Sequence, residues 1–353
     1  MIRAVGIVPS VRVVVPDGID DPARPSGGNR YDRRTCDGLA SLGWSVGELP
    51  VAGPWPWPDR AARDALATTL RSVPDRTVVL LDGLVASTVP EVVVPESGRL
   101  RLVVLVHMPL EEQRAEEREV LASAAAVVTT SGWTRDLLLR RHGLPPGAVH
   151  VAPPGVDAAE LAAGSPDGGQ LLCVAAVTPG KGHDVLLEAL GALAHRPWHC
   201  VCVGSLDRDP AFVDRVRRRA DELGLGDRVS FPGPRVGARL AASYAAADAL
   251  VLASRAETYG MVVTEALAHG LPTVAAAVGG LPEALGHAPD GSRPGLLVPP
   301  DDPSALAGAL ERWLADPAVR ADLRTSARGR RATLTGWTET VRRVSDVLTG
   351  VAA

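Results

Sequence analysis

Short apolar runs alternate along the chain with segments that carry the period of amphipathic helices. The apolar runs are rich in valine and leucine and show little polar alternation, as is typical of parallel strands covered on both faces. This repeated alternation predicts a doubly wound α/β architecture. Strands are expected at residues 4–8, 77–81, 102–106, 126–130, 171–177, 200–203, 249–253 and 273–278. Helices are expected at residues 59–71, 110–123, 182–194, 210–223 and 262–269.

A stretch rich in turn residues separates the two series of strands. It begins at Pro153, Pro154 and Gly155 and ends near Gly169, and a new strand series starts directly after it. The chain is therefore expected to form two Rossmann-like domains, residues 1–160 and 170–332, that face a central cleft. The tail that follows the second domain is expected to be helical.

Charge and cysteine content narrow the classes of partner. The 353 residues include 37 basic and 41 acidic side chains, a net charge of −4, which argues against nucleic acid or an anionic membrane as the main partner. No apolar run approaches the roughly 18 residues of a membrane span, so no integral membrane association is expected. Four irregularly spaced cysteines favour small core residues and a reducing compartment, so a cytoplasmic location is expected. Oligomeric state cannot be inferred from this pattern.

The segment after the expected strand at 249–253 has the features of a ligand site. Gly260 permits close backbone approach, and the free N–H groups of the helix that follows can hold a phosphate. Glu257 and Glu265 are eight residues apart, up to roughly 12 Å along a helix, and return to within a quadrant of one face. Two such carboxylates suit the hydroxyls at both ends of a sugar-linked diphosphate. The alternative is an ordinary solvated helix start, where acidic residues are common.

Lys181 is the only lysine in the chain, and it lies in the loop that follows the strand at 171–177. An ammonium group there can contact a diphosphate. The loop is not a Walker A motif, because the Gly-x₄-Gly-Lys-[Ser/Thr] spacing is absent. A Gly279-Gly280 turn after the strand at 273–278 permits tight backbone geometry at the same sheet edge. The alternatives are an exposed loop lysine and an ordinary strand–turn–helix junction.

The first half of the chain offers a second set of candidates. Gly27 and Gly28 precede a helix and present backbone amides to an anion or an acceptor, with the chain's only asparagine, Asn29, beside them. His107 directly follows the strand at 102–106, where it could contact a hydroxyl, although a lone histidine is more often structural. Trp55 or Trp57 could line an acceptor pocket, with simple loop packing as the alternative. No metal-binding spacing such as His-Glu-x-x-His occurs.

Together these motifs resemble the GT4 family of retaining glycosyltransferases, which have the GT-B fold. The resemblance covers nearly the whole chain. It implies a nucleotide-sugar donor bound by the C-terminal domain and an acceptor on the N-terminal domain. It also implies that the last helix, residues 336–353, packs back on the N-terminal domain. Neither a metal nor another cofactor is implied.

The resemblance also assigns roles to individual residues. Lys181 would contact the diphosphate, Glu265 the ribose and Glu257 the hydroxyls of the donor sugar. His107 would lie near the reacting centre, so that His107, Lys181 and Glu257 form the candidate catalytic set. The remaining donor contacts are expected from Gly27, Gly28, Thr258, Tyr259, Gly260, Met261 and Val262. The acceptor contacts are expected from Asn29, Arg30, Tyr31 and His107.

One departure from the family pattern concerns the phosphate. Members commonly carry an arginine five residues before the lysine, and Ala176 stands there in this chain. The diphosphate would then rest on Lys181 and helix amides, unless Arg255 or Arg30 turns in.

The expected activity is retaining, metal-independent transfer of a sugar from a UDP-sugar, with a GDP-sugar as the alternative, to a soluble small-molecule acceptor. A nucleotide-sugar epimerase or hydrolase, a catalytically weakened binding partner, and more distantly a dehydrogenase remain alternatives.

Overall fold

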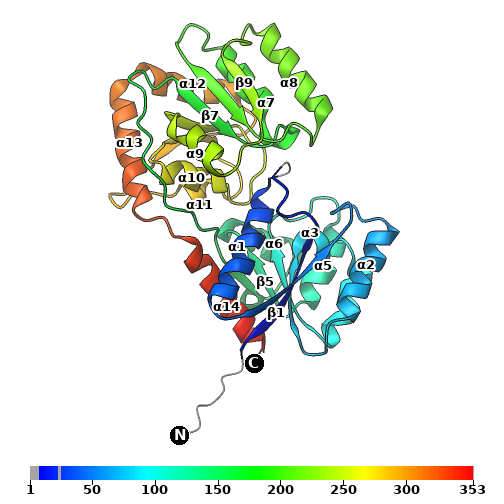
Figure 1. Ribbon diagram of the computed structural model, residues 1–353. Helices are drawn as coiled ribbons and strands as arrows, with labels where there is room; N and C mark the ends of the chain where they lie inside the picture. The colour runs from blue at the N-terminus through cyan, green and yellow to red at the C-terminus, as the bar shows by residue number, and fades with distance from the viewer. Residues whose placement is uncertain (1–7, 23–24, 353) are drawn as a thin grey trace. The chain divides into compact units, whose positions relative to one another are not determined.

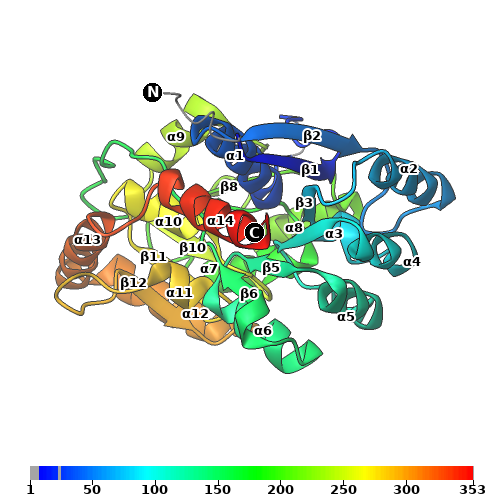
Figure 2. The same ribbon diagram turned by 90° about the horizontal axis from the view of Figure 1, so that it is seen from below.

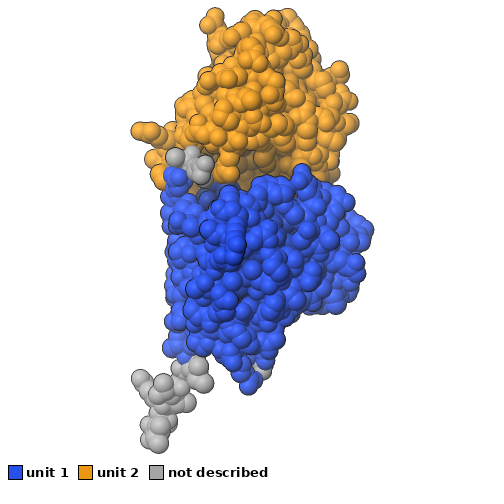
Figure 3. All heavy atoms as spheres, turned by 90° about the vertical axis from the view of Figure 1, so that its right-hand side faces the viewer, with its two compact units in different colours: residues 1–21, 26–155, 337–353 blue, residues 22–25, 156–336 orange. Residues whose placement is uncertain are grey.

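The computed structural model describes residues 8–22 and 25–352, which divide into two compact units (Figures 1 and 3). Unit 1 comprises residues up to 21, residues 26–155 and residues from 337 onward. Unit 2 comprises residues 22–25 and 156–336. The C-terminal segment therefore belongs to the same unit as the first half of the chain.

Unit 1 is built on a six-stranded parallel sheet in the order β2-β1-β3-β4-β5-β6 (Figure 2). The strands are β1 (Ser10–Pro16), β2 (Ser45–Val51), β3 (Val78–Asp82), β4 (Arg101–Val106), β5 (Ala126–Thr129) and β6 (Val149–Val151). The α-helices are α1 (Gly27–Ser41), α2 (Arg60–Arg71), α3 (Gly83–Ala86), α4 (Pro90–Val93), α5 (Arg114–Ser123), α6 (Gly132–His142) and α14 (Trp337–Ala352). The 3₁₀ turns are η1 (Val94–Gly98) and η2 (Pro146–Ala148).

Unit 2 has a second six-stranded parallel sheet, in the order β12-β11-β10-β7-β8-β9. The strands are β7 (Gln170–Val174), β8 (His199–Val203), β9 (Val229–Gly233), β10 (Ala249–Leu252), β11 (Thr273–Ala276) and β12 (Gly295–Val298). The helical elements are η3 (Pro179–Lys181), α7 (His183–Gly191), α8 (Pro210–Glu222), α9 (Gly237–Ala245), α10 (Met261–Ala268), α11 (Leu281–Leu285), α12 (Pro303–Ala315) and α13 (Pro317–Arg331).

The two sheet orders place a topological switch point in each unit. In unit 1 the chain reverses direction across the sheet between β1 and β3, and in unit 2 between β7 and β10. Ligands of open α/β sheets bind outside the carboxyl ends of the strands at such points. The loops that follow β1 and β3, and those that follow β7 and β10, are therefore the positions where function is expected.

The structure confirms the predicted α/β class and the strands that are buried on both faces. The predicted runs at 77–81, 102–106, 126–130, 171–177, 200–203, 249–253 and 273–278 correspond to β3, β4, β5, β7, β8, β10 and β11. Of the run predicted at 4–8, residues 4–7 lie outside the described residues. The predicted helix at 110–123 begins only at Arg114, and the one at 182–194 ends at Gly191.

Short polar side chains cap the N-termini of several helices. Ser26, Asp59 and Ser131 accept hydrogen bonds from backbone N–H groups of the first turns of α1, α2 and α6, and Asp209 and Asp302 do the same for α8 and α12. At the other end of α6, Gly143 adopts the left-handed conformation that commonly ends a helix. These local signals fix where each helix meets the edge of its sheet.

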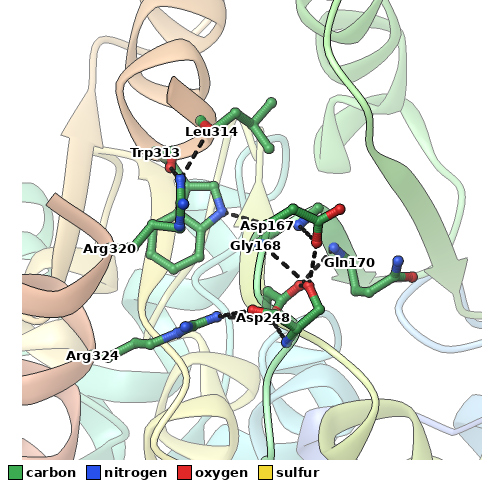
Figure 4. A network of polar contacts seen from close by, with 10 residues as sticks. Asp167, Gly168, Gln170, Asp248, Trp313, Leu314, Arg320 and Arg324 are labelled. Carbon is green, nitrogen blue, oxygen red and sulfur yellow. Dashed lines mark hydrogen bonds and ion pairs between the residues drawn. The ribbon is translucent and has the colours of Figure 1, made fainter. Parts of the chain in front are cut away.

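A polar network centred on Asp248 secures the amino-terminal edge of the sheet in unit 2 (Figure 4). Asp248 precedes β10, and its fully buried carboxylate accepts hydrogen bonds from the backbone N–H groups of Ser165 and Gln170, at 2.5 and 2.8 Å. It also accepts one from Arg324 of α13, at 2.8 Å. A buried charge with this many partners holds its segments in place. This edge is structural, whereas the opposite edge carries the candidate site.

The C-terminal helix α14 packs against α1 within unit 1. The absence of a side chain at Gly38 of α1 makes room for Val341 of α14. Two hydrogen bonds fasten the helix, from Trp44 Nε1 to Ser345 Oγ at 2.9 Å and from Thr340 Oγ1 to the Pro153 carbonyl at 2.7 Å. The amphipathic tail thus completes unit 1, although it follows unit 2 in the sequence.

Candidate active site

An ion pair between Lys181 and Glu257 marks the switch point of unit 2. Lys181 lies in the loop after β7 and Glu257 in the loop after β10, and their Nζ and Oε1 atoms are 2.6 Å apart. Ser254 Oγ donates a second hydrogen bond to Glu257 Oε1, at 3.1 Å. The side chains of Lys181 and Glu257 are 30% and 14% exposed, so both groups can be reached by a ligand. Two charged residues that the sequence analysis singled out separately are therefore direct partners.

Glycines allow the loops of this site to touch backbone to backbone. Gly182 has φ +66°, and a Cβ atom there would overlap the carbonyl oxygen of Ala253. Gly279 and Gly280 lie in the same way against the carbonyl groups of Glu257 and Thr258. Any side chain at these positions would push the loops apart. The glycines thus hold the loop of Lys181 and the turn after β11 against the segment that carries Glu257.

The N-terminus of α10 lies beside this ion pair in the sequence and presents unsatisfied backbone groups. Gly260 occupies the N-cap position with φ +94°, and no side chain caps the helix. The Val263 N–H donates to the Gly260 carbonyl at 2.9 Å, so the N–H groups before it in the first turn are the ones left for an anion. Tyr259, just before it, is buried, which raises the pKa of its hydroxyl to about 12. Met261 and Val262 are half-buried, so this stretch can offer a ligand its backbone amides.

Glu265 lies further along α10 and is held by an aromatic pair. Its Oε2 atom accepts a hydrogen bond from the hydroxyl of Tyr244, at 2.8 Å. The Tyr244 ring stacks on His269, with centroids 5.2 Å apart, and His269 Nδ1 donates to the Glu160 carbonyl at 2.8 Å. Tyr244 thus orients a carboxylate that remains half-buried in the second turn of α10.

Arg255, which could have compensated for Ala176, is already engaged. Its guanidinium forms a bidentate contact with Asp184 at 2.9 and 3.0 Å and a further one with Asp301 at 2.6 Å. Hydrogen bonds to Asp184 and then to Asp301 raise the pKa of this guanidinium above its usual value. Among the described residues, Lys181 is thus the cation that pairs with Glu257, and the amide end of α10 follows three residues later in the sequence.

The switch point of unit 1 gathers His107, Asp32 and Asp82. His107 Nε2 lies 2.8 Å from Asp32 Oδ1 and 3.9 Å from Asp82 Oδ2, and all three side chains are buried. Burial alone would lower the pKa of His107, but the charge and hydrogen bond of Asp32 raise it to about 9. Burial, and next the charge of Asp32, raise the pKa of Asp82 to about 8. The cluster therefore holds a cationic imidazole at neutral pH.

The start of α1 lies directly against this histidine. A Cβ atom at Gly28 would come within 3.2 Å of the His107 ring, so Gly28 allows the helix to approach it. Gly27 and Asn29 lie in the first turn, where the Asn29 N–H bonds to Ser26 Oγ at 3.0 Å. The next residue, Arg30, is half-buried.

Tyr31 differs from its neighbours, because it is fully buried and its hydroxyl donates to the Ala152 carbonyl at 2.8 Å. Its ring contacts the His107 ring edge-on, with centroids 5.2 Å apart. Tyr31 thus supports His107 from inside the fold, and in this arrangement its hydroxyl is not presented to a ligand.

Among the described residues, two groups of side chains have donor atoms close enough to hold a metal ion. One is the cluster of Asp32, Asp82 and His107, and in the other Cys173, His183 and Cys202 lie within the core of unit 2. In both groups the donor atoms lie within 4.8 Å of one another. The four cysteines are free and buried, which agrees with the expectation of core residues.

Comparisons with known proteins show which family and fold the chain shares. The family model "Glycosyl transferases group 1" matches residues 163–330, and "Glycosyltransferase Family 4" matches residues 85–160. The chain is 36% identical over 246 residues to the D-inositol 3-phosphate glycosyltransferase of Frankia alni, covering 65% of this chain and 59% of that protein. It is 34% identical over 253 residues to D-inositol 3-phosphate glycosyltransferase 1 of Catenulispora acidiphila, covering 66% and 59%. The chain thus spans about three-fifths of the length of these relatives.

Solved structures share the fold over nearly the full length. Sucrose-phosphate synthase of Thermosynechococcus elongatus superposes with a TM-score of 0.78 at 23% identity, covering 97% of this chain and 98% of that one. Anabaena HepE, solved in complex with UDP and glucose, superposes with a TM-score of 0.77 at 17% identity, covering 97% and 99%. The two Rossmann-like units therefore form a GT-B fold. The chain belongs to the GT4-type glycosyltransferases.

Several residues of the site could not be selected from sequence motifs. Asp32 and Asp82 flank His107, Ser254 holds Glu257, and Tyr244 holds Glu265. Asp82 had a detectable signal, because it is a charged residue that ends an otherwise apolar strand. Among the described residues, no helix is both long and apolar enough to cross a membrane.

Proposed function

We propose that this protein transfers a sugar, with retention of anomeric configuration, from a nucleoside diphosphate sugar to a hydroxyl of a small soluble acceptor. A UDP-sugar is the favoured donor and a GDP-sugar is the alternative. The observation that carries the proposal is the Lys181–Glu257 ion pair at the switch point of unit 2, next in sequence to an uncapped helix N-terminus. The four free cysteines favour the cytoplasm as its compartment.

The ion pair suits a ligand that is anionic at one end and rich in hydroxyls at the other. A diphosphate would draw the Lys181 ammonium away from Glu257 and accept hydrogen bonds from the first N–H groups of α10. The released Glu257 carboxylate would then accept hydrogen bonds from the donor sugar. Glu265, oriented by Tyr244, is the proposed ribose ligand. Each group has a partner before the donor arrives and exchanges it for the donor.

In the proposed reaction, an acceptor hydroxyl attacks the anomeric carbon on the face from which the diphosphate departs. The bond from the anomeric carbon to the phosphate oxygen breaks, the bond to the acceptor oxygen forms, and the acceptor proton passes to the departing phosphate. Lys181 and the α10 amides stabilise the charge that develops on that phosphate. His107 is proposed to donate a hydrogen bond from Nδ1 to the transferred sugar, since Nε2 faces Asp32. No metal is required in this scheme.

The acceptor is proposed to be a small polyol. The relatives are described as glycosyltransferases of D-inositol 3-phosphate, a phosphorylated ring of secondary alcohols. We therefore propose a hydroxylated ring as the acceptor of this chain. This proposal does not assign a phosphate group to the acceptor. Gly27, Gly28, Asn29 and Arg30 at the start of α1 are the proposed contacts near the acceptor.

The proposal is tested by incubating the protein with UDP-glucose, UDP-N-acetylglucosamine or GDP-mannose, with and without a panel of cyclitols and sugars. The expected result is a new glycoside whose anomeric coupling constant matches that of the donor sugar, formed at the same rate with and without EDTA. Inverted product would contradict retention, and loss of activity in EDTA would contradict metal independence. Consumption of donor without acceptor, faster than any transfer, would favour the hydrolase or epimerase alternative.

A further inference from the structure

A cavity in unit 1 is lined by residues to which the proposed reaction gives no role, Trp57 among them. It has a volume of about 240 Å³ and is lined by the loop between β2 and α2, by Thr88 after α3, and by the first turn of α5. Helices α2 and α5 both pack against α4, which brings these segments together on one flank of the sheet (Figure 2). The loop after β2 and the start of α5 both follow strands at their carboxyl ends. The cavity therefore belongs to the same edge of the sheet as His107.

The apolar wall of the cavity is an exposed tryptophan. Trp57 stands between Pro56 and Pro58, which also line the cavity, and its side chain is 57% exposed. Its backbone N–H bonds to the Pro54 carbonyl at 2.7 Å, which fixes the turn. An indole face held open by prolines suits a flat ligand with an apolar face, such as the C–H face of a pyranose or cyclitol ring. The volume lies below the roughly 300–1,000 Å³ of pockets for drug-sized ligands, so it suits a single ring.

The opposite side of the cavity offers polar groups without partners. Thr88 is only 5% exposed, and its hydroxyl has no hydrogen-bond partner within the described part of the chain. A buried hydroxyl without a partner is unfavourable, and rotation of the Thr88 side chain toward the cavity that it lines would let a ligand hydroxyl satisfy it. The side chains of Gln113 and Glu116 also line the cavity, and no described residue pairs with either side chain. The cavity thus combines one stacking face with several hydrogen-bonding groups.

The charges around the cavity distinguish between ligands. Arg63 is the only basic residue that lines it, and this guanidinium is already paired with Glu91. Glu116 contributes a carboxylate that forms no ion pair with a described residue. When Glu91 is counted with its partner Arg63, the charges at the cavity sum to −1, which opposes a phosphate group and favours an ammonium group.

We propose that this cavity binds the acceptor, and that the acceptor is a sugar or cyclitol ring that carries an amino group and not a phosphate. In this assignment Trp57 stacks on the ring, the Thr88 hydroxyl and the Gln113 amide bond its hydroxyls, and Glu116 pairs with the ammonium group. The assignment rests on the proposed function, since it names the acceptor of that reaction. The acceptor of this chain would then differ from the phosphorylated cyclitol that is named for its relatives.

Ligand-observed saturation-transfer NMR on the whole protein tests this assignment without a donor. The probes are the methyl glycoside of glucosamine, methyl glucoside and glucose 6-phosphate, at a pH of about 6.5 where the amine is cationic. The amino glycoside is expected to bind at least about fivefold more tightly than the neutral one, and the phosphate to bind weakest. Binding of none of the probes, or preference for the phosphate, would overturn the assignment.

Variants with matched controls separate stacking from charge. Trp57→Ala is expected to weaken the binding of both glycosides by about tenfold. Trp133→Ala, at another partly exposed tryptophan of unit 1, is expected to leave their binding unchanged. Glu116→Gln is expected to abolish the preference for the amine, whereas Glu119→Gln on the same helix keeps it. Equal behaviour of each variant and its control would overturn the assignment. A parallel titration with UDP reports on the donor site of unit 2, so failure of the proposed function is recognised independently.

Discussion

The switch points of the two units carry charge in different ways. In unit 2 the charged groups are partly exposed, and each is held by one or two partners that a ligand can replace, as in the Lys181–Glu257 ion pair. In unit 1 the charged groups, His107, Asp32 and Asp82, are buried against one another. The first arrangement suits binding and release of an anion. The second fixes the protonation of one imidazole.

This difference separates two physical tasks. A diphosphate brings its own charge, so unit 2 needs a cation and free amides that cost little to release from their resting partners. An imidazole that must stay cationic at a pH above its usual pKa needs a nearby carboxylate whose charge is not screened by solvent. Substitutions in unit 2 should therefore alter donor binding and rate, whereas substitutions in unit 1 should alter the dependence on pH.

The largest effect is expected for Lys181→Ala. Since Arg255 is bound by Asp184 and Asp301, no other described cation contacts Glu257 or can easily replace the ammonium group. We expect kcat/KM to fall by about a thousandfold or more, with an unchanged circular dichroism spectrum. Steady-state kinetics with saturating acceptor measure this.

Arg196→Ala is the matched control, because it removes a comparably exposed ion pair, that with Glu311, from the loop before β8. It should leave kcat/KM within about twofold of the wild type. A Lys181→Ala enzyme with near-normal kinetics would remove the ammonium group from the mechanism.

An intermediate effect is expected for Asp32→Asn. Loss of the carboxylate removes the main cause that raises the pKa of His107 to about 9, so this pKa should drop to its usual value of roughly 6.5 or lower. Activity should then fall about tenfold at pH 8 and much less at pH 6. The pH profile of kcat and the NMR titration of the imidazole test this. Asp37→Asn, at an exposed position of α1, should keep the wild-type profile, and an unshifted profile in Asp32→Asn would contradict the assignment.

The smallest effect is expected for Asp82→Asn, on stability. The pKa of Asp82 is raised to about 8, so the folded protein keeps a proton that the unfolded chain loses near pH 4. Stability therefore falls as the pH rises from about 4 to about 8, and the raised pKa of His107 adds a loss in the same direction between about 6.5 and about 9.

The amide introduced by Asp82→Asn would mimic the protonated acid and keep an acceptor for the Leu84 N–H, which bonds to Asp82 at 2.6 Å. The variant should match the wild type at about pH 4 and below and become steadily more stable than it as the pH rises to about 8, where the difference should be about 1 kcal/mol or more, at least roughly 2–4 °C in Tm. Thermal melts from about pH 4 to about pH 9 measure the difference, with the exposed Asp64→Asn as control. Parallel pH profiles of stability for Asp82→Asn and the wild type would contradict the pKa ordering.

Whether a strand could be predicted from the sequence depended on how deeply it is buried. Strands in the middle of each sheet are apolar because helices cover both faces, and β3, β4, β5, β7, β8, β10 and β11 were all predicted. The missed strands β2, β6, β9 and β12 are the four edge strands, which are short or partly exposed and hence lack a continuous apolar run. Strand β1 was also not predicted. Arg12 interrupts its apolar run, and the first strand was expected at residues 4–8 instead.

The candidate site was predictable where a residue type is rare or a backbone is constrained. Lys181, Gly260 and the Gly279-Gly280 turn stood out for those reasons, and the sheet order brings them to one edge. Asp32 could not be selected, because one carboxylate among several polar residues of α1 is distinguished only by its contact with His107, 75 positions away. Thr88 likewise has no motif, and its unpartnered hydroxyl appears only after folding.

The central claim is that unit 2 binds a diphosphate between Lys181 and the N-terminus of α10. Calorimetric titration of UDP and of uridine, into the wild type and into Lys181→Ala, tests it most directly. The account predicts that the substitution weakens the binding of UDP by at least about thirtyfold. The weaker binding of uridine should stay unchanged, because only the diphosphate contacts the ammonium group. Equal UDP affinity in the two proteins, or no heat with UDP in the wild type, would contradict it.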